Sequence, residues 1–157
     1  MVFAASAPLR GFELVSSPAS AAMSVPVPAV TKASGEAGQP GVLLVEDEAL
    51  LRLTVAEALQ DRGFKVVEAA NGEEALQILR ERSGDIDWLF TDIRLPGAIN
   101  GWHVAFAFRF IHPLRPVIYA TGWSQDLPQS VAGSLVFRKP YDLDEILEAL
   151  QTLSKRS

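Results

Sequence analysis

The chain after position 40 alternates between two kinds of hydrophobic pattern. Short runs rich in β-branched and apolar residues are typical of strands buried on both faces of a parallel sheet. Between them, apolar residues recur every three or four positions, as in an amphipathic helix. The predicted strands are 42–45, 65–69, 88–91, 117–120 and 135–137. The predicted helices are 49–62, 72–82, 101–112 and 143–153.

The alternation of strand and helix predicts an α/β fold, a doubly wound five-stranded parallel sheet with helices on both faces. Only 17 residues separate Thr121 from Lys139, and Pro128 and Gly133 interrupt them. The fourth helix of such a fold must therefore be short or irregular. The segment 101–112 contains VAFAFRF, which also alternates, so its period alone leaves a strand as an alternative there.

Two local signals support the helix boundaries. Gly63 follows the first predicted helix as a stop signal. Asn71 precedes the second as an N-cap, with Glu74 three residues later as its capping-box partner.

Residues 1–40 have a different composition. They are rich in Ala, Ser, Pro, Val and Gly, and five prolines break every apolar stretch. This composition predicts a disordered extension, followed by one domain at 41–157. The segment lacks the basic start of a secretory signal, and Met23 is an alternative start of translation.

Composition narrows the classes of function. The net charge is −5, from 14 basic and 19 acidic side chains, so we do not expect direct binding to DNA or another polyanion. The chain has no cysteine, which excludes thiolate metal sites and is consistent with the cytoplasm. No segment reaches the roughly 18 to 20 apolar residues that a membrane span needs, so no membrane association is expected.

Polar side chains cluster where the predicted strands end. In an open parallel sheet these ends share one edge, so we expect the following residues to meet: Glu46, Asp47, Asp92, Thr121 and Lys139. Converging carboxylates without His or Cys suit Mg²⁺. A lysine and a hydroxyl beside them form a pocket for an anion such as phosphate. Asp92, between the metal and Lys139, would act as a nucleophile and form an aspartyl phosphate.

Each of these residues also has a structural explanation. Asp92 could turn the chain after a strand, and Glu46 and Asp47 could cap the following helix. Thr121 could belong to an ordinary turn at a strand end. Lys139 could be a solvated strand terminus.

Four segments resemble the signatures of response-regulator receiver domains of two-component signalling: VLLVEDEALLR, FTDIRLPG, YATG and FRKPYDLDEIL. The resemblance extends from Gly41 to about Ser154 and implies a flavodoxin-like receiver fold. The YATG segment is similar to a branch of single-domain regulators in which Phe-Ala-Thr-Gly follows strand four. That branch also has a compact region around its fourth helix.

The resemblance implies a role for each site residue. Asp47 and Asp92 would bind Mg²⁺ directly, Glu46 would act largely through water, and the backbone carbonyl of Arg94 would complete the metal site. Asp92 would accept the phosphoryl group. Thr121 and Lys139 would hold its oxygens.

The chain departs from the receiver pattern at Val136. Receivers commonly carry Tyr or Phe three residues before the lysine, where it moves with the threonine, and Val136 stands there. Phe137 is adjacent, but the two-residue period of a strand places it on the opposite face. The usual threonine–aromatic switch is therefore in doubt.

Trp102, Phe106 and Phe110 follow one another at four-residue intervals in the third predicted helix. Either this helix is buried on several sides, or it presents an aromatic patch to a partner. The region between Thr121 and Gly133 is a second candidate surface.

The sequence therefore predicts a stand-alone phosphoacceptor and not a turnover enzyme. A histidine kinase or phosphotransfer protein would phosphorylate Asp92, and the product would alter binding to a downstream protein, allow a homodimer, or act as a phosphate sink. One alternative is an interaction module that works without phosphorylation. A second is a phosphatase of the haloacid dehalogenase type, but that class needs an Asp where Arg94 stands.

Overall fold

The structure is a computed structural model and describes residues 38–122 and 129–154. The strands are β1 (Gly41–Val45), β2 (Lys65–Ala69), β3 (Trp88–Asp92), β4 (Val117–Thr121) and β5 (Leu135–Arg138). The helices are α1 (Ala49–Asp61), α2 (Gly72–Arg82), the 3₁₀ turn η1 (Ser83–Asp85), α3 (Gly101–Ile111) and α4 (Leu143–Ser154). The predicted disordered extension lies outside the described residues, apart from 38–40.

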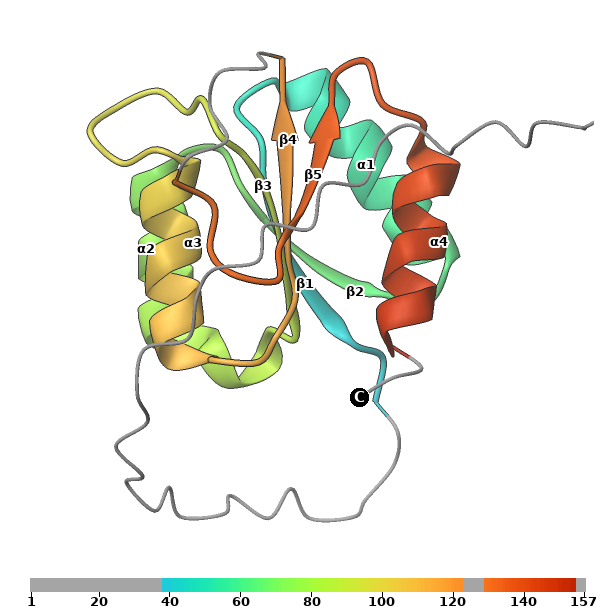
Figure 1. The fold of residues 1–157 in the computed structure, drawn as a ribbon, viewed down its shortest axis with the longest axis horizontal. Helices are drawn as coiled ribbons and strands as arrows, with labels where there is room; N and C mark the ends of the chain where they lie inside the picture. The colour runs from blue at the N-terminus through green and yellow to red at the C-terminus, as the bar shows by residue number, and fades with distance from the viewer. Residues whose placement is uncertain (1–37, 123–128, 155–157) are drawn as a thin grey trace, which may run out of the picture.

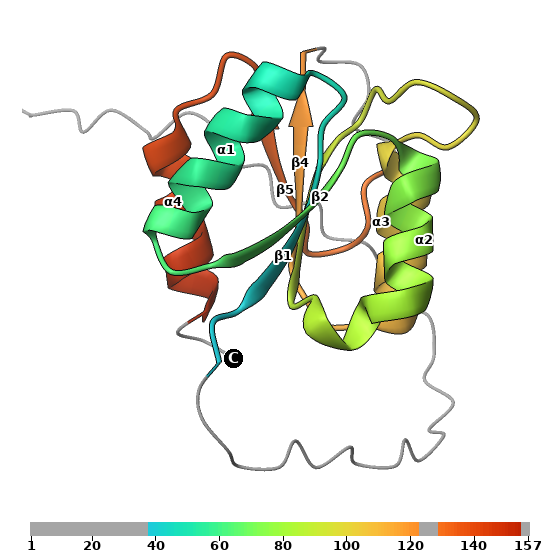
Figure 2. The same cartoon turned by 180° about the vertical axis from the view of Figure 1, so that it is seen from behind.

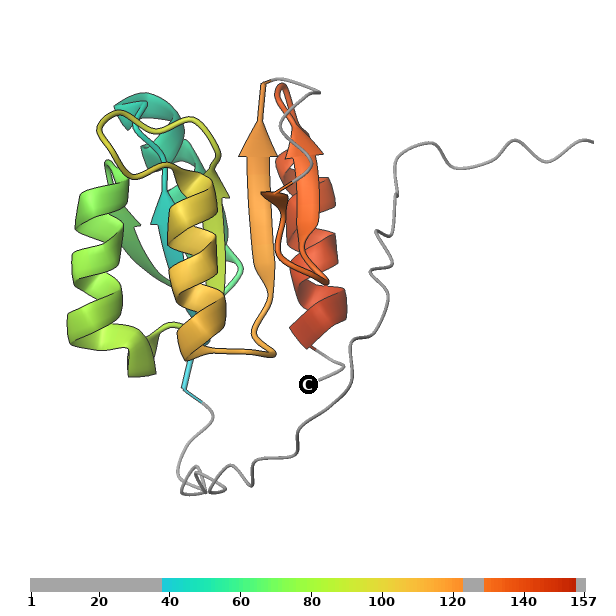
Figure 3. The same ribbon diagram turned by 60° about the vertical axis from the view of Figure 1, so that its left-hand side comes forward.

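All five strands are parallel and lie in the order β2-β1-β3-β4-β5. Figures 1 and 2 show α1 and α4 covering one face of this sheet and α2 and α3 covering the other. Figure 3 shows the resulting three layers. The predicted doubly wound five-stranded parallel sheet is confirmed.

The core is divided by the sheet into two apolar clusters. One lies under α1 and α4 and contains Leu44, Phe90 and Ile118. The other lies under α2 and α3 and contains Leu43 of β1 and Leu89 of β3, which alternate along these strands with residues of the first cluster. Every residue of β1, β3 and β4 is buried, which explains why their sequences show no alternation.

The segment 101–111 is helical, which resolves the ambiguity in its sequence. Its first turn is fixed by a capping box: the Asn100 side chain accepts from the His103 amide at 3.2 Å, and His103 Nδ1 accepts from the Asn100 amide at 3.2 Å. Because histidine is not the usual partner in this motif, this capping box could not be predicted from the sequence.

The cap of α2 differs in one detail from its prediction. Asn71 Oδ1 accepts a hydrogen bond from the Glu74 amide at 2.8 Å, as expected. The Glu74 carboxylate instead accepts from the amide of Ala70, at 2.7 Å, one residue before the cap. The helix start is therefore stabilised from both sides, but not by the reciprocal pair that the sequence suggested.

The connection between β4 and β5 was predicted to hold a short or irregular helix. Residues 123–128 of it lie outside the described part of the chain, and its described part, 129–134, contains no α-helix. Over the same described ranges, no helix is both long and apolar enough to span a membrane.

Candidate functional site

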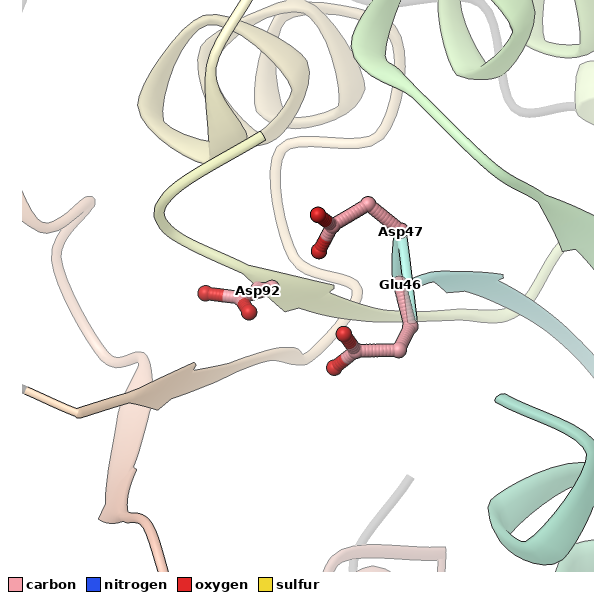
Figure 4. A group of neighbouring side chains, drawn as sticks. All are labelled: Glu46, Asp47 and Asp92. Carbon is pink, nitrogen blue, oxygen red and sulfur yellow. The ribbon is translucent and has the colours of Figure 1, made fainter. Parts of the chain in front are cut away.

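Three carboxylates gather beyond the ends of β1 and β3. Glu46 and Asp47 follow the last residue of β1, and Asp92 is the last residue of β3. One oxygen from each lies within 4.8 Å of the others. Figure 4 shows these three side chains. Glu46 and Asp92 are buried, whereas Asp47 is exposed. This edge of the sheet thus holds two buried acids and one acid that is exposed to solvent.

Lys139 neutralises the two buried acids. Its Nζ atom donates to Glu46 Oε2 at 2.9 Å and to Asp92 Oδ2 at 2.6 Å, and its side chain is 24% exposed. Burial alone would lower the pKa of Lys139, but hydrogen bonds and attraction to Asp92 and Glu46 outweigh burial and hold that pKa above its ordinary value. Lys139 is therefore not the solvated strand terminus that the sequence left open.

The second oxygen of each buried acid accepts from a nearby amide. Glu46 Oε1 accepts from the Glu48 amide at 3.2 Å, and Asp92 Oδ1 accepts from the Arg94 amide at 3.0 Å. Asp92 thus bonds an amide of the turn that follows β3. Glu46 does not cap α1, because the N-cap is Glu48, whose side chain makes no capping hydrogen bond. Burial raises the pKa of Glu46, although Lys139 and the Glu48 amide oppose the rise.

Thr121 ends β4, next to the strand that carries Asp92, and is 1% exposed. Its backbone carbonyl accepts from the Lys139 amide at 2.7 Å, which ties the start of the 139–141 turn to the end of β4. The peptide bond between Lys139 and Pro140 is cis. Since β4 lies between β3 and β5, Asp92, Thr121 and Lys139 stand at the ends of three neighbouring strands.

Two residues that the sequence did not single out shape this edge. Arg52 of α1 donates from Nη1 to the Glu46 carbonyl at 2.7 Å and from Nε to Glu68 at 3.3 Å, which fixes the chain where β1 ends. A Cβ atom at Gly101 would overlap the Asp92 carbonyl, so glycine lets α3 begin against the backbone of β3. Neither contact has a local sequence signal, because both join segments distant in the chain.

The composition of the site is compatible with Mg²⁺. The ion prefers oxygen ligands, binds through a small number of carboxylates and keeps several waters. Here one exposed and two buried carboxylates lie within 4.8 Å of one another. The donor set therefore suits a hard divalent cation at this edge.

The sequence model of the family described as "Response regulator receiver domain" matches residues 42–151. The chain belongs to this family. Receiver domains are signalling modules of two-component systems.

Two curated relatives illustrate the match. The sensor kinase CckA of Brucella abortus is 33% identical to this receiver domain over 132 residues, which cover 81% of the chain but only 14% of CckA. Sporulation initiation phosphotransferase F of Bacillus subtilis is 30% identical over 114 residues, which cover 70% of the chain and 90% of that protein.

Solved receiver domains have the same fold. A response regulator receiver protein from Sinorhizobium medicae superposes with a TM-score of 0.69 at 32% identity, over 73% of this chain and 94% of its own. The response regulator TrrA of Thermotoga maritima, solved in complex with Mg²⁺ and BeF, gives a TM-score of 0.64 at 33% identity, over 73% and 99%.

The aromatic position of receiver domains is filled differently here. Val136 packs into the cluster under α2 and α3, while Phe137 packs into the opposite cluster, as the strand period predicted. Tyr119 of β4 is the register partner of Val136, and its ring lies 4.6 Å from that of Trp102. Its hydroxyl accepts from the Val131 amide at 3.3 Å. An aromatic ring is thus present on this face, but β4 supplies it.

Burial of the Tyr119 phenol raises its pKa to about 12, although the Val131 amide and Arg109 oppose the rise. The sequence held a signal for Tyr119 that went unused: it lies two residues before Thr121, so both share a face of β4.

Helix α3 is apolar on both sides. Trp102 and Phe108 are buried, whereas Phe106 is 72% exposed and Phe110 is 85% exposed. Trp102 and Phe110 are roughly 80° apart around a helix of 3.6 residues per turn, which is why one packs inward and the other does not. A shallow groove beside the exposed rings is lined by α3 and by Leu76 of α2. The aromatic patch considered from the sequence therefore exists.

Proposed function

We propose that this receiver domain, at residues 41–157, accepts a phosphoryl group on Asp92 in a reaction that requires Mg²⁺. The observation that carries the proposal is the position of Asp92: its carboxylate is buried, bonded to Lys139 at 2.6 Å, and within 4.8 Å of two further carboxylates. A nucleophile, a mobile cation and a metal-binding set thus meet at one strand end.

The transfer proceeds by attack of a carboxylate oxygen of Asp92 on the phosphorus of a phosphohistidine. The bond between phosphorus and the donor nitrogen breaks, and the nitrogen keeps the electron pair. Lys139, which has three donor hydrogens, turns from the carboxylates to the phosphoryl oxygens as negative charge moves outward. The Thr121 hydroxyl donates a further hydrogen bond to the phosphoryl group.

Asp47 and Asp92 would hold the metal directly, with Glu46 acting through water and the Arg94 carbonyl as a further ligand. Bound Mg²⁺ supplies positive charge that offsets the charge of the phosphoryl group during transfer. The support for these roles is the acidic cluster itself and the resemblance of four segments of the chain to receiver signatures.

The partners follow from the chemistry. A cytoplasmic histidine kinase or phosphotransfer protein donates the phosphoryl group, and a downstream protein or a second copy binds the product. We also propose that the chain acts as a separate protein. The support is that the aligned region covers 90% of the length of the Bacillus phosphotransferase. Measuring the mass of the native protein tests this proposal. In this proposal the chain changes its own phosphorylation state and does not turn over an external substrate.

A second candidate is an interaction module that binds a partner without phosphorylation. Two observations favour it: Val136 stands where receivers commonly carry an aromatic, and Phe106 and Phe110 are exposed. The paired acidic site argues against it, because an interaction module has no need of buried charges.

Intact mass after incubation with acetyl phosphate tests the proposal. The wild-type chain is expected to gain the mass of one phosphoryl group with Mg²⁺ and to gain nothing without it. Asp92→Ala should gain nothing in either condition, whereas Asp85→Ala, which removes an exposed acid elsewhere, should behave as wild type. No adduct on the wild-type chain, even with histidine kinases supplied, would favour the interaction module.

A further inference from the structure

Tyr141 lies beside the acidic site on one face of the sheet. It follows the turn at Lys139 and Pro140, and its side chain packs into the cluster under α1 and α4. Its ring meets Phe90 edge-on, with centroids 6.0 Å apart. Phe90 is two residues before Asp92 on β3, so both side chains leave the strand on the same face. The Tyr141 ring therefore packs against a side chain on the same face of β3 as Asp92.

The Tyr141 hydroxyl is a buried polar group without a hydrogen-bond partner among the described residues. Buried hydroxyls in folded proteins almost always have a partner, and an orphaned one calls for an explanation such as a bound ion or water. Phenylalanine at this position would fill the same space without the orphaned oxygen. The unpartnered hydroxyl therefore calls for an explanation, and the charges of the acidic site suggest one.

The charged groups that act on this hydroxyl belong to the acidic site. Burial raises the pKa of Tyr141 to about 12, and the carboxylate of Glu46 contributes next, against the opposing effect of Lys139. Asp92 and Glu48 contribute smaller increases. The phenol is therefore within electrostatic reach of the acidic cluster, and Glu46 acts on it more strongly than any other carboxylate.

Lys139 and a divalent cation compete for the same carboxylate oxygens. In this structure Lys139 Nζ occupies Glu46 Oε2 and Asp92 Oδ2. A second cation among these acids repels the ammonium group, and the Glu46 oxygen then lacks its donor. Because Glu46 is 1% exposed, the loss of this hydrogen bond raises the free energy of the protein. A neutral donor close to Glu46 relieves it without adding charge.

We propose that Tyr141 is a positioning residue of the acidic site, whose hydroxyl donates a hydrogen bond to Glu46 when Mg²⁺ is bound and Lys139 has moved away. The inference rests on the proposed function, because it requires Mg²⁺ to bind at this cluster. The hydroxyl holds Glu46 in the orientation that the hydrated ion needs, and it does so only in the metal-bound state.

Tyr141→Phe is the test, and Tyr119→Phe is its matched control. Each variant removes one buried hydroxyl, but that of Tyr119 accepts a hydrogen bond from Val131 on the opposite face. Tyr141→Phe should bind Mg²⁺ about 3- to 10-fold more weakly by calorimetry, the equivalent of one hydrogen bond. It should unfold at the same or a higher urea concentration without metal. Tyr119→Phe should keep its affinity for Mg²⁺ and unfold at a lower urea concentration.

A spectroscopic readout separates this role from a purely structural one. The chain has two tyrosines, so Tyr141 is the sole tyrosine of the Tyr119→Phe variant. Adding Mg²⁺ to that variant should produce a tyrosine difference spectrum in the near ultraviolet. In Tyr141→Phe, where Tyr119 alone remains, Mg²⁺ should produce none.

Two different failures are distinguishable. If the wild-type chain shows no Mg²⁺ binding, the proposed function fails and this inference fails with it. If the wild-type chain binds Mg²⁺ and Tyr141→Phe binds it equally well, the inference alone is overturned. A Tyr141→Phe variant that loses as much stability without metal as Tyr119→Phe would also overturn it, because its hydroxyl would then have a partner already.

Discussion

The two faces of the sheet contribute different chemistry to the same edge. On the α1/α4 face, Glu46, Asp92 and Lys139 form a network of charges in which each buried acid is bonded to the lysine. On the α2/α3 face, Tyr119 and Val136 are neutral, and the Tyr119 hydroxyl accepts a hydrogen bond from the Val131 amide. One face is built to hold and move charge. The other is built to connect a strand to the loop that follows it.

The comparison is sharpened by the two tyrosines. Tyr119 and Tyr141 lie on opposite faces, Tyr119 is buried and Tyr141 half-buried, and the pKa of each is raised to about 12. On the α2/α3 face the hydroxyl is satisfied by the Val131 amide, whereas on the α1/α4 face the hydroxyl has no partner in the described part of the chain. A neutral face can satisfy its polar groups permanently. A face whose charges rearrange during function contains a hydroxyl donor that has a partner in only one of its states.

The largest effect is expected when the charged face loses its cation. Lys139→Met leaves Glu46 and Asp92 as neighbouring buried acids, and breaking a buried ion pair in this way costs about 3 kcal/mol of unfolding free energy. Saturating Mg²⁺ should return part of that stability, since the ion replaces the missing positive charge. Urea unfolding with and without Mg²⁺ measures both effects.

Arg138→Met is the control for that variant, because Arg138 is exposed, ends β5 and directly precedes Lys139. It should change the free energy of unfolding by less than about 0.5 kcal/mol. Equal losses in the two variants would show that the ion pairs of Lys139 do not stabilise the fold, and the contrast between the faces would fail.

The effect expected from alkaline pH is smaller for each residue, and its cause differs between the two faces of the sheet. The phenols titrate at about 12 in the folded protein and near 10 when unfolded. The unfolded chain therefore loses these protons first, so stability is complete below pH 10 and falls as pH rises toward 12, by on the order of 2 kcal/mol for each tyrosine.

Glu46→Gln distinguishes the two phenols, since the Glu46 carboxylate raises the pKa of Tyr141 but is not among the causes for Tyr119. In a Tyr119→Phe background the substitution should lower the pKa that is read from phenolate absorbance. In a Tyr141→Phe background it should leave that pKa unchanged. A shift of equal size in both backgrounds would mean that the acidic cluster acts on both faces alike.

Much of the fold could be predicted from the sequence, because it depends on local signals. The central strands are buried on both faces, so their apolar runs are continuous, and the five strands and four helices predicted with residue ranges lie within two residues of their observed bounds. The gathering of the acids followed from the parallel sheet alone. Topology places the ends of the strands together whatever their side chains are.

The contacts that tune the site could not be predicted, because they depend on distances between segments far apart in the chain. Arg52 meets the Glu46 carbonyl only when α1 packs against the sheet. The Tyr141 ring meets Phe90 of β3, and its hydroxyl has no partner among the described residues. Sequence periodicity assigned Val136 and Phe137 to opposite faces, but it did not reveal that Tyr119 occupies the space beside Val136.

The most direct test of the account is to locate the phosphoryl group among the three carboxylates. Borohydride reduces an acyl phosphate to the alcohol and would convert a phosphorylated aspartate to homoserine. After incubation with acetyl phosphate and Mg²⁺, peptide mass spectrometry should find homoserine at position 92 and unmodified acids at positions 46 and 47. Reduction at Glu46 or Asp47, or at none of the three while the chain carries the added mass, would contradict the assignment of Asp92 as the phosphoacceptor.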